Sequence, residues 1–273
     1  MGKSNLRKPA VAGQFYPSAS SELKKQIESF IDKKANKFDV YGCVLPHAGY
    51  IYSGPVAGYT VSQINIKDRI ILLGPNHTGS GTPFSIMTQG IWQTPLGEIN
   101  IDDELAEALL GSCEYLQDDT LAHLYEHSLE VELPFLQYFK NNFKIVPIAI
   151  ASNNLSELKE VGKAIASVIN KLNIKDSVMI VASSDMTHYE PQSEAEKKDK
   201  QAIEAILKLD EDELFQKIRR FNITMCGYAP VAVMLSAVKL LGAQKGRLSK
   251  YQTSGDITGD TDSVVGYAGI TIS

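Results

Sequence analysis

Cysteines, long apolar runs and excess positive charge are all scarce in this sequence. The three cysteines among 273 residues are odd in number and widely spaced, which argues against a disulfide framework and favours a reducing compartment, the cytoplasm. No apolar run approaches the roughly 18 residues that cross a bilayer, and the opening MGKSNLRKPAVAGQFYP lacks the apolar segment of a secretory signal. The net charge of -5 argues against a nucleic-acid-binding surface. We therefore expect neither a membrane nor a nucleic acid as a partner.

The composition is that of a soluble globular protein. Hydrophobic residues make up 44% and charged residues 22% of the chain, which is enough apolar side chain for one large core. No stretch has the character of a linker, so we predict one domain over residues 1–273. Strand-like and helix-like segments alternate along the chain. This alternation predicts an α/β fold with a central mixed, mostly parallel sheet flanked by helices.

Apolar periodicity places the individual elements. Helical spacing is clearest at residues 22–34 and 156–172, and Asp102 or Asp103 is suited to cap a helix that ends at Leu110. Pro147 argues against a central position in the sheet for the strand at 143–151. The other predicted segments are helices at 194–221 (two, broken near Asp210) and 229–241, strands at 41–45, 69–73, 177–182 and 263–272, and strands or a hairpin within 84–101.

Polar residues follow three of the predicted strands. The strand at 41–45 leads to His47, the strand at 69–73 to His77, and the strand at 177–182 to Asp185 and His188. In open α/β sheets, ligands bind beyond the carboxyl ends of the strands. Core packing does not readily explain His or Asp at three separate strand ends. We therefore predict that these side chains form one site.

The two histidine loops are rich in glycine. In LPHAGYIYSG, Gly49 and Gly54 predict a tight loop that lets the backbone approach a ligand, although His47 could instead cap a carbonyl group. In LLGPNHTGSG, the loop around His77 could alternatively cradle a phosphate. No lysine follows that loop as a Walker motif requires, which disfavours the phosphate interpretation.

Asp185 and His188 lie three residues apart in SSDMTHY. A carboxylate at this spacing can orient or charge-stabilise a histidine that acts as a general acid or base near neutral pH. In the alternative interpretation, Asp185 caps a helix N-terminus and His188 lies in its first turn; the two interpretations are compatible. Our hypothesis assigns catalytic roles to both residues.

The segment AHLYEHSLEVELPFL contains the remaining histidines. We expect His127 and Glu130 to share one helix face and to line the substrate pocket, with the leucines facing the core. A His-x-x-Glu pair could also supply metal ligands, as Glu-x-x-His does in di-iron bundles, but a second copy is missing. Pro134 should kink or restart this helix. His123 has no polar companion and is expected at the surface or behind the site.

Cys226 lies in TMCGYAP, just before the helix predicted at 229–241. Because a thiol at a helix N-terminus tends to have a lowered pKa, Cys226 could be a metal ligand or a nucleophile. A small buried residue is the third interpretation. Cys43, within a strand, and Cys113, after a helix, are expected to be structural.

Seven of these segments together resemble the Memo family, also called the AmmeMemoRadiSam system protein B family. They are RKPAVAGQFYP, LPHAGYIYSGPVAG, LLGPNHTG, PLGEI, EHSLEVELPFL, SSDMTHY and MCGYAP, in order from about residue 7 to the C-terminus. The resemblance implies a fold similar to that of the class III extradiol dioxygenases, which use non-haem iron. In EHSLEVELPFL, this chain has Glu132 where the family often has Gln or His.

The resemblance also implies roles for the residues singled out above. It implies that His47, His77 and Cys226 bind a metal, that Asp185 lines the same pocket, and that His188 stands at the position of the catalytic histidine of the dioxygenases. Two histidines with a carboxylate form the usual open iron(II) triad. A thiolate in place of the carboxylate keeps the negative charge but is softer, so iron or copper is expected and zinc is an alternative. A thiolate beside activated oxygen also risks oxidation, so the dioxygenase reaction does not follow from the fold alone.

Three functions fit these observations. The first is a metal-dependent, dioxygenase-like oxidoreductase in which His188 and Asp185 handle protons. The second is a zinc-type hydrolase with His188 as the base, although a hydrolase motif such as His-Glu-x-x-His is missing. The third is a non-catalytic binding or signalling module with a small-molecule or peptide ligand in the pocket. Animal Memo proteins are linked to phosphotyrosine-peptide binding, but this chain has few basic residues near the pocket motifs. The substrate, the native metal and the oligomeric state stay open.

Overall fold

A mixed sheet of nine strands forms the centre of the computed structural model, which describes residues 6–273. Eight strands lie in the order β10-β12-β2-β9-β3-β8-β4-β7, and β11 pairs with β12. The four neighbours β2, β9, β3 and β8 are parallel to one another. Antiparallel pairs flank them on both sides, through β12 and β4. The predicted α/β domain with a mixed sheet is confirmed, and the parallel character is strongest at its centre.

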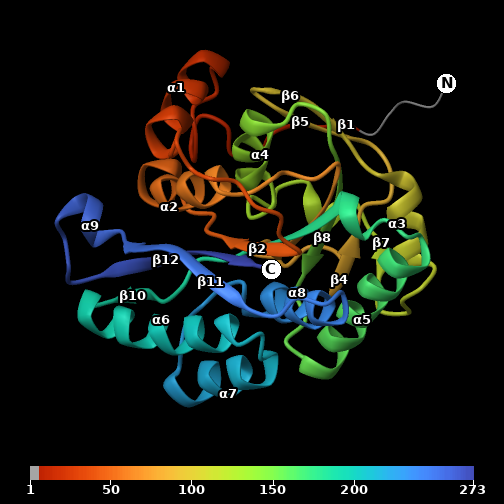
Figure 1. The fold of residues 1–273 in the computed structure, drawn as a ribbon. Coiled ribbons are helices and arrows are strands. Elements are labelled where there is room, and N and C mark those ends of the chain that lie inside the picture. The colour runs from red at the N-terminus through yellow and green to blue at the C-terminus, as the bar shows by residue number, and fades with distance from the viewer. Residues whose placement is uncertain (1–5) are drawn as a thin grey trace.

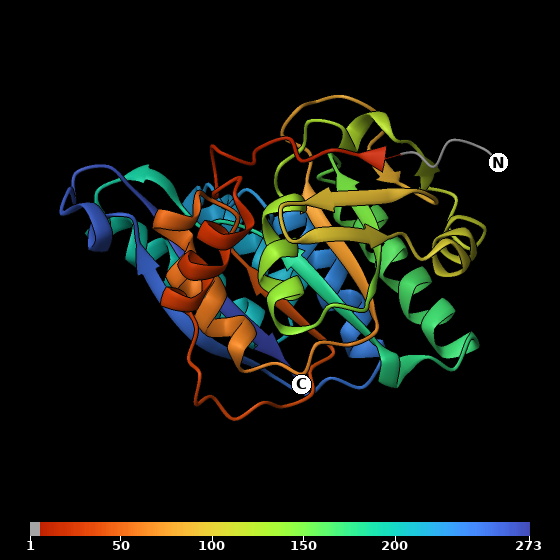
Figure 2. The same cartoon turned by 90° about the horizontal axis from the view of Figure 1, so that it is seen from above.

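A smaller sheet of three strands lies beside the large one near the N-terminus (Figure 2). It consists of β1 (Leu6–Arg7), β5 (Ile91–Thr94) and β6 (Gly97–Asn100), so the excursion predicted within residues 84–101 contains a hairpin. The strands of the large sheet are β2 (Gly42–Leu45), β3 (Arg69–Pro75), β4 (Phe84–Ile86), β7 (Gln117–Asp118), β8 (Lys144–Ile150), β9 (Val178–Ser183), β10 (His188–Glu190), β11 (Gly246–Thr253) and β12 (Val264–Ile272).

Helices cover both faces of the large sheet (Figure 1). One group contains α1 (Ser20–Phe30), α2 (Tyr50–Ser62) and α4 (Leu133–Phe139), and the other contains α5 (Leu155–Lys171), α6 (Gln192–Leu207), α7 (Glu211–Phe221) and α8 (Tyr228–Leu240). The other helical segments are α3 (Asp103–Leu110), α9 (Gly255–Thr258), η1 (Leu121–His123), η2 (Glu130–Glu132) and η3 (Lys175–Ser177). Within residues 6–273, no helix combines the length and apolar character needed to cross a bilayer.

The core lies on both faces of the parallel strands. Every residue of β2 and β9 is buried, as is all of β3 and β8 except the first residue of each. Parallel strands covered by helices on both faces need apolar side chains at consecutive positions, and the runs RIILL and SVMIVA meet that need. Each large aliphatic side chain buried here stabilises the fold by about 1.5–3 kcal/mol relative to exposure.

The predicted cap at Asp102 and the predicted break near Asp210 are confirmed. The Asp102 carboxylate accepts a hydrogen bond from the Leu105 N–H and begins α3. Asp210 does the same for the Glu213 N–H at 2.8 Å, and so separates α6 from α7 as predicted. Each cap satisfies an N–H group that has no partner within its helix, which is worth about 1 kcal/mol.

Some elements differ from the sequence prediction. Residues expected to form a glycine-rich loop after His47 instead enter α2, and Gly54 lies inside that helix. A Cβ atom on Gly54 would lie 2.4 Å from the ring of Phe30, so this glycine permits close packing of α1 on α2 rather than a turn. The strand β11 was not predicted, because its polar sequence GRLSKYQT gives no apolar signal.

Pro147 lies within β8, between β3 and β4, so the argument against an internal strand was wrong. The Pro147 carbonyl accepts a hydrogen bond from the Met87 N–H, just beyond the end of β4. The N and C=O groups of one strand residue point to the same side. The missing N–H therefore faces the place where β4 has already ended, and no ladder bond is lost.

Candidate metal centre

Three adjacent parallel strands end at one cavity of about 660 Å³. In the order β2-β9-β3, their ends lead to His47, to Asp185 and His188, and to His77. Cys226 reaches the same cavity from the residues before α8. The structure thus brings together the strand-end side chains that the sequence singles out. His127 also lines the cavity.

The rest of the cavity wall is largely aromatic and carries no positive charge. Its aromatic lining residues are Phe15, Tyr52, Tyr189 and Tyr267. Among the described residues, no lysine or arginine lines the cavity. Tyr189 has a φ of 58°, a left-handed backbone conformation that is strained for a bulky residue. The cavity therefore suits an uncharged or metal-bound ligand better than a free phosphate.

His47 is buried and is held by hydrogen bonds at both its backbone and its ring. Its backbone N–H donates to the Asp185 carboxylate at 2.8 Å, and its ring Nδ1 lies 2.7 Å from the Ser183 Oγ. Its Nε2 lies 3.3 Å from the Cys226 Sγ. Burial, followed by the nearby imidazoles of His127 and His77, lowers the pKa of His47 well below its usual value. His47 is consequently a neutral imidazole with one nitrogen directed at the thiol.

His77 is oriented by a buried carboxylate, Glu126. The His77 Nδ1 lies 2.9 Å from Glu126 Oε1, and the His77 backbone N–H donates to the other carboxylate oxygen. Burial raises the pKa of Glu126, but hydrogen bonds and charge from His77, with a further bond from the Ser128 N–H, bring it down to about 2. A carboxylate accepts only, so Nδ1 carries the proton and Nε2 keeps its lone pair. This carboxylate–histidine arrangement is the one that commonly supports metal-binding histidines.

The Cys226 thiol does not have the lowered pKa expected from its place before a helix. Burial, followed by the Asp185 carboxyl, raises the pKa of Cys226. Loss of hydration outweighs the helix N-terminus in the free thiol. The Asp185 N–H donates to Sγ at 3.2 Å, which supports negative charge on the sulfur. A bound cation would favour the thiolate much more strongly.

The donor atoms of His47, His77 and Cys226 all lie within 4.8 Å of one another. Two ligands at bond lengths of about 2.0–2.3 Å from one ion lie roughly 3.5 Å apart in tetrahedral geometry. The 3.3 Å separation of Nε2 and Sγ meets this requirement without rearrangement. The residues present therefore fit a mononuclear metal ion with an open position toward the cavity.

A second group, His77, Glu126 and His127, also has donor atoms within this range. Both oxygens of Glu126 already accept hydrogen bonds, from the His77 ring and from backbone N–H groups. The His127 ring stacks on that of His77, with centroids 4.7 Å apart. These contacts make Glu126 a support for His77, and His127, whose Nδ1 lies 3.4 Å from Glu126 Oε1, lines the cavity next to His77.

Comparison with known proteins agrees with this arrangement of motifs. The sequence matches the family model described as Memo-like protein over residues 7–271. This chain belongs to the Memo family. It is 45% identical to MEMO1 family proteins from Methanopyrus kandleri (97% of this chain, 98% of the relative) and Methanocaldococcus jannaschii (96% and 97%). It is 44% identical to one from Nitrosopumilus maritimus, over 97% of this chain and 98% of the relative.

The Memo fold also has a distant structural likeness. An uncharacterized protein from Escherichia coli K12, known from a crystal structure, superimposes with a TM-score of 0.55 over 84% of this chain and 98% of that one. The two sequences are 13% identical. This likeness supports the α/β fold alone.

His188 lines the cavity of the Memo chain with one ring nitrogen fixed. Its Nδ1 lies 2.8 Å from the Met186 carbonyl and 2.9 Å from the Thr224 carbonyl. Carbonyls only accept, so Nδ1 carries a proton, and the lone pair of a neutral ring lies on Nε2. His188 begins β10 and is not in the first turn of a helix, so the interpretation of Asp185 as an N-cap was wrong.

Asp185 is directed at His47 and not at His188. Its carboxylate accepts from the N–H groups of His47 and Ala48. Burial raises the pKa of Asp185 to about 6, with the His188 charge acting in the opposite direction. The expected hydrogen bond that would orient His188 is not found in the described part of the chain, and backbone carbonyls orient that ring instead.

Glu130 lies outside the cavity, which corrects its prediction as a pocket residue. Its carboxylate is fully buried and pairs with Arg7 at 2.7 Å, and it also accepts from the Tyr16 hydroxyl at 2.5 Å. His127 and Glu130 do not share a helix face, because the helix starts only at η2 and continues as α4 from Leu133, with Pro134 in the first turn of α4. The predicted restart at Pro134 is confirmed. Glu130 ties the N-terminal segment to this turn.

Several residues around the site were not found by sequence reasoning. Glu126, Ser183 and Glu132 support the two candidate histidine ligands from behind, and Phe15 and Tyr267 line the cavity. The only local signal was an acidic residue directly before His127 in the motif YEHS. His123, expected at the surface or behind the site, is fully buried and packs against the Trp92 ring.

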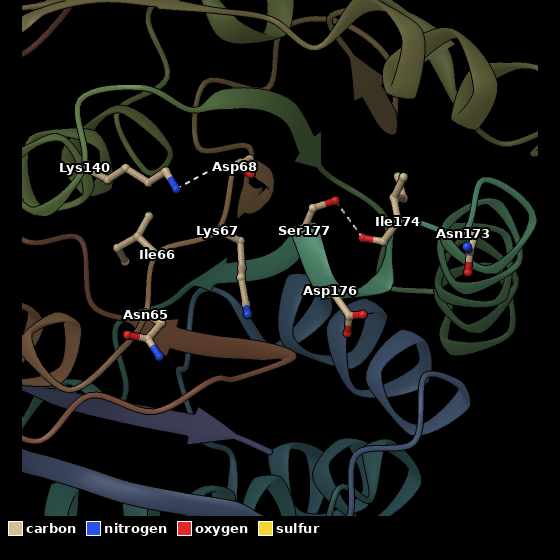
Figure 3. Close-up of a pocket in the computed structure, with 9 residues that line it drawn as sticks. All are labelled: Asn65, Ile66, Lys67, Asp68, Lys140, Asn173, Ile174, Asp176 and Ser177. Carbon is tan, nitrogen blue, oxygen red and sulfur yellow. Dashed lines mark hydrogen bonds and ion pairs between the residues drawn. The ribbon is translucent and has the colours of Figure 1, made fainter.

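A second hollow lies at the amino ends of the parallel strands, among the residues that precede β3 and β9 (Figure 3). Its charged lining residues include Lys140 and Asp68, which pair with each other at 2.6 Å. Lys67, also in its wall, pairs with Asp39 at 2.6 Å. Both lysines are thus paired, and no histidine or cysteine is among the residues that line this hollow.

Proposed function

We propose that this Memo-family chain binds one redox metal ion, iron or copper, through His47, His77 and Cys226. The observation that carries the proposal is the convergence of three donor atoms within 4.8 Å from three separate segments. Each imidazole is held with its other nitrogen occupied, so each offers a lone pair toward the same point. A neutral, buried His47 and a hydrogen-bonded sulfur favour cation binding over an empty polar cavity.

The reaction we propose is that of a metal-dependent oxidoreductase similar to the class III dioxygenases. When bound, the ion would supply Lewis acidity and electron transfer next to the cavity. His188 would accept a proton from the substrate at its free Nε2, because Nδ1 is occupied by two carbonyls. Asp185 lines the same cavity as His188 and would take part in the same proton transfer.

The ligand in the cavity would be a small molecule or peptide side chain. The aromatic walls would hold its apolar part, while His127 and His188 offer polar contacts. A binding module without catalysis would use the same cavity. The lack of a basic lining residue among those described disfavours recognition of a phosphate group by the cavity alone.

Zinc hydrolysis is the second candidate, and the donor set is the observation that favours it. Zinc accepts histidine and cysteine ligands equally well, and His188 could deprotonate a bound water. Hydrolysis of an ester or amide with zinc, and none with iron, would select this function.

Elemental analysis of the untagged protein tests the metal proposal. Purified parent protein, or parent reconstituted with iron(II) or copper(I), should hold about one ion per chain. Cys226→Ser should lose most of that metal, because a hydroxyl is a poor ligand for these ions. Cys113→Ser is the matched control, since Cys113 is a buried thiol that follows α3 outside the cavity, and this change should leave the metal content unchanged. A parent protein that binds neither ion, or a Cys226→Ser variant that keeps its metal, would disprove the proposal.

A further inference from the structure

Glu132 is a fully buried carboxyl group without a basic partner. Neighbouring acids in the same segment are paired: Glu130 with Arg7, and Glu126 with His77. Among residues 6–273, no lysine, arginine or histidine nitrogen lies within ion-pair distance of Glu132, and its Oε2 has no hydrogen-bond partner. The charged neighbour that acts on it is Asp185, which has the same sign. An ionised carboxylate in such a place would be very costly.

The other oxygen of Glu132 leads to the candidate metal ligand His47. Glu132 Oε1 lies 2.7 Å from the Ser183 Oγ. The same Oγ lies 2.7 Å from His47 Nδ1 and 2.7 Å from the Ser128 carbonyl oxygen. Ser183 is the last residue of β9, which is rigidly placed between β2 and β3. A continuous hydrogen-bonded path therefore runs from Glu132 to His47.

Counting protons along this path fixes the direction of each bond. The Ser128 carbonyl can only accept, so it takes the single Ser183 hydroxyl proton. The Ser183 oxygen must then accept in its two other contacts. His47 Nδ1 and Glu132 Oε1 consequently both donate. An ionised Glu132 would leave one of the three contacts without a proton.

We propose that Glu132 is a positioning residue for His47: it stays a neutral carboxylic acid and, through the Ser183 hydroxyl, holds the His47 ring with Nδ1 protonated and Nε2 free toward Cys226. The rings of the two histidines then make different hydrogen bonds at Nδ1. The His77 ring donates to an anionic carboxylate, whereas the His47 ring donates to a neutral hydroxyl. This arrangement avoids placing a further negative charge behind the thiol of Cys226. Only the metal-affinity part of the test rests on the proposed metal centre.

Metal-free protein tests the protonation states directly. At pH 8, infrared difference spectra of the parent against Glu132→Gln should show a protonated carboxylic acid band that the variant lacks. NMR of protein labelled with ¹⁵N-histidine should show His47 protonated at Nδ1. Glu132→Gln should keep that tautomer, because its amide N–H can donate to Ser183 in the same place. Ser183→Ala should lose it. Absence of the acid band, or a Ser183→Ala variant with the parent tautomer, would overturn the proposal.

Binding of Zn²⁺, measured by competition with a chromogenic chelator, tests the positioning role. Glu132→Leu should bind Zn²⁺ about 10- to 100-fold more weakly than the parent, a loss usual for a group that orients a metal ligand. Glu132→Gln should stay close to the parent. Glu211→Gln is the control, because Glu211 is a buried acid on α7 that pairs with Lys239 away from the cavity. Unchanged affinity in a folded Glu132→Leu variant would overturn the role.

The two proposals fail in different ways. If the parent itself does not bind Zn²⁺, iron or copper, the metal centre is wrong, while the acid band and the His47 tautomer still decide the protonation of Glu132. If Glu132→Leu does not fold, the spectra of Glu132→Gln and Ser183→Ala decide the proposal alone.

Discussion

At the scale of single residues, the protein accommodates buried ionisable side chains in two ways. It pairs them with a side chain of opposite charge, or it keeps them uncharged. Arg7 and Glu130 form a buried ion pair, and Arg7 also donates to the carbonyls of His123 and Glu126 at 2.7 and 2.6 Å. His123 shows the other solution. Its Nε2 lies 3.1 Å from the Ser85 carbonyl, and its ring is closed off from solvent. A protonated His123 would bring a second positive charge close to Arg7.

The buried His123 should make the protein less stable in mild acid. Burial, and then the positive charge of Arg7, lower the pKa of His123 from 6.5 to about 4. Between these values the unfolded chain binds more protons, so the free energy of unfolding falls as the pH drops below 6.5. Protonation of this residue alone should lower the free energy of unfolding by about 3 kcal/mol between neutral pH and pH 4. Urea unfolding of the parent and of His123→Gln at pH 7 and pH 4.5 measures this contribution. The parent should lose more stability than the variant; equal losses would contradict the assignment.

Loss of the Arg7 charge should be among the most destabilising single changes. Arg7→Met leaves Glu130 buried without its cation, which typically costs about 3–5 kcal/mol. Arg7→Lys should cost less but still clearly destabilise, because an ammonium cannot reach all three acceptors of the guanidinium. Chemical denaturation of both variants checks the order. A cost below about 1 kcal/mol for Arg7→Met would show that this buried pair contributes little.

At the scale of elements, small residues decide how α1 packs against α2. A Cβ atom on Gly58 would lie 2.7 Å from the Phe30 Cβ and 3.1 Å from the Phe30 backbone. On Gly54, the added atom would meet the outer ring of Phe30 instead. A backbone cannot move aside as a ring can. A side chain at Gly54 would therefore require only a movement of the Phe30 ring, whereas one at Gly58 would require the two helices to move apart.

The two glycines of α2 should respond differently to alanine. Alanine gains about 1 kcal/mol over glycine from helix propensity alone. Gly58→Ala should nevertheless destabilise the protein by about 1–3 kcal/mol, since it forces the two helices apart. Gly54→Ala is the matched control and should cost less, because the Phe30 ring can rotate. Thermal unfolding of both variants measures the difference. A stabilised Gly58→Ala protein would mean that the helices separate without penalty.

At the scale of the whole molecule, one core joins both helical layers to the sheet. Buried side chains from α1, α2, α5 and α8 belong to the same apolar cluster as those of the central strands. The candidate ligands His47, His77 and Cys226 come from three parts of that unit. An ion held by all three would stabilise the folded chain and not the unfolded one.

The chain should therefore unfold in one cooperative step that metal shifts upward. Differential scanning calorimetry should show a single transition for the metal-free protein. Zn²⁺ at about 100 times its dissociation constant should add about 2.7 kcal/mol by mass action, and Cys226→Ser should abolish most of that shift. Two separated transitions would contradict the single domain, and a shift equal in both proteins would place the ion elsewhere.

Much of the fold was predictable because its signals are local. The apolar runs of β3 and β9, the periodicity of α5 and the caps at Asp102 and Asp210 each act within a few residues. The helix α2 was missed because it is buried nearly all round and contains Pro55 and two glycines, so it lacks an amphipathic pattern. Glu130 was misplaced because its partner, Arg7, lies 123 residues away.

The sequence alone determined the central parallel strands, most helices, the histidines and aspartate that follow strand ends and the cysteine before α8, since chain chemistry and spacing set these locally. Tertiary structure decided which of these side chains meet. The order β2-β9-β3 placed His47 and His77 on either side of Ser183 and Asp185, and packing brought Glu126 and Glu132 behind the two imidazoles. Burial then set their charges, because the cost of removing a charged group from water depends on every neighbour in space and not on its neighbours along the chain.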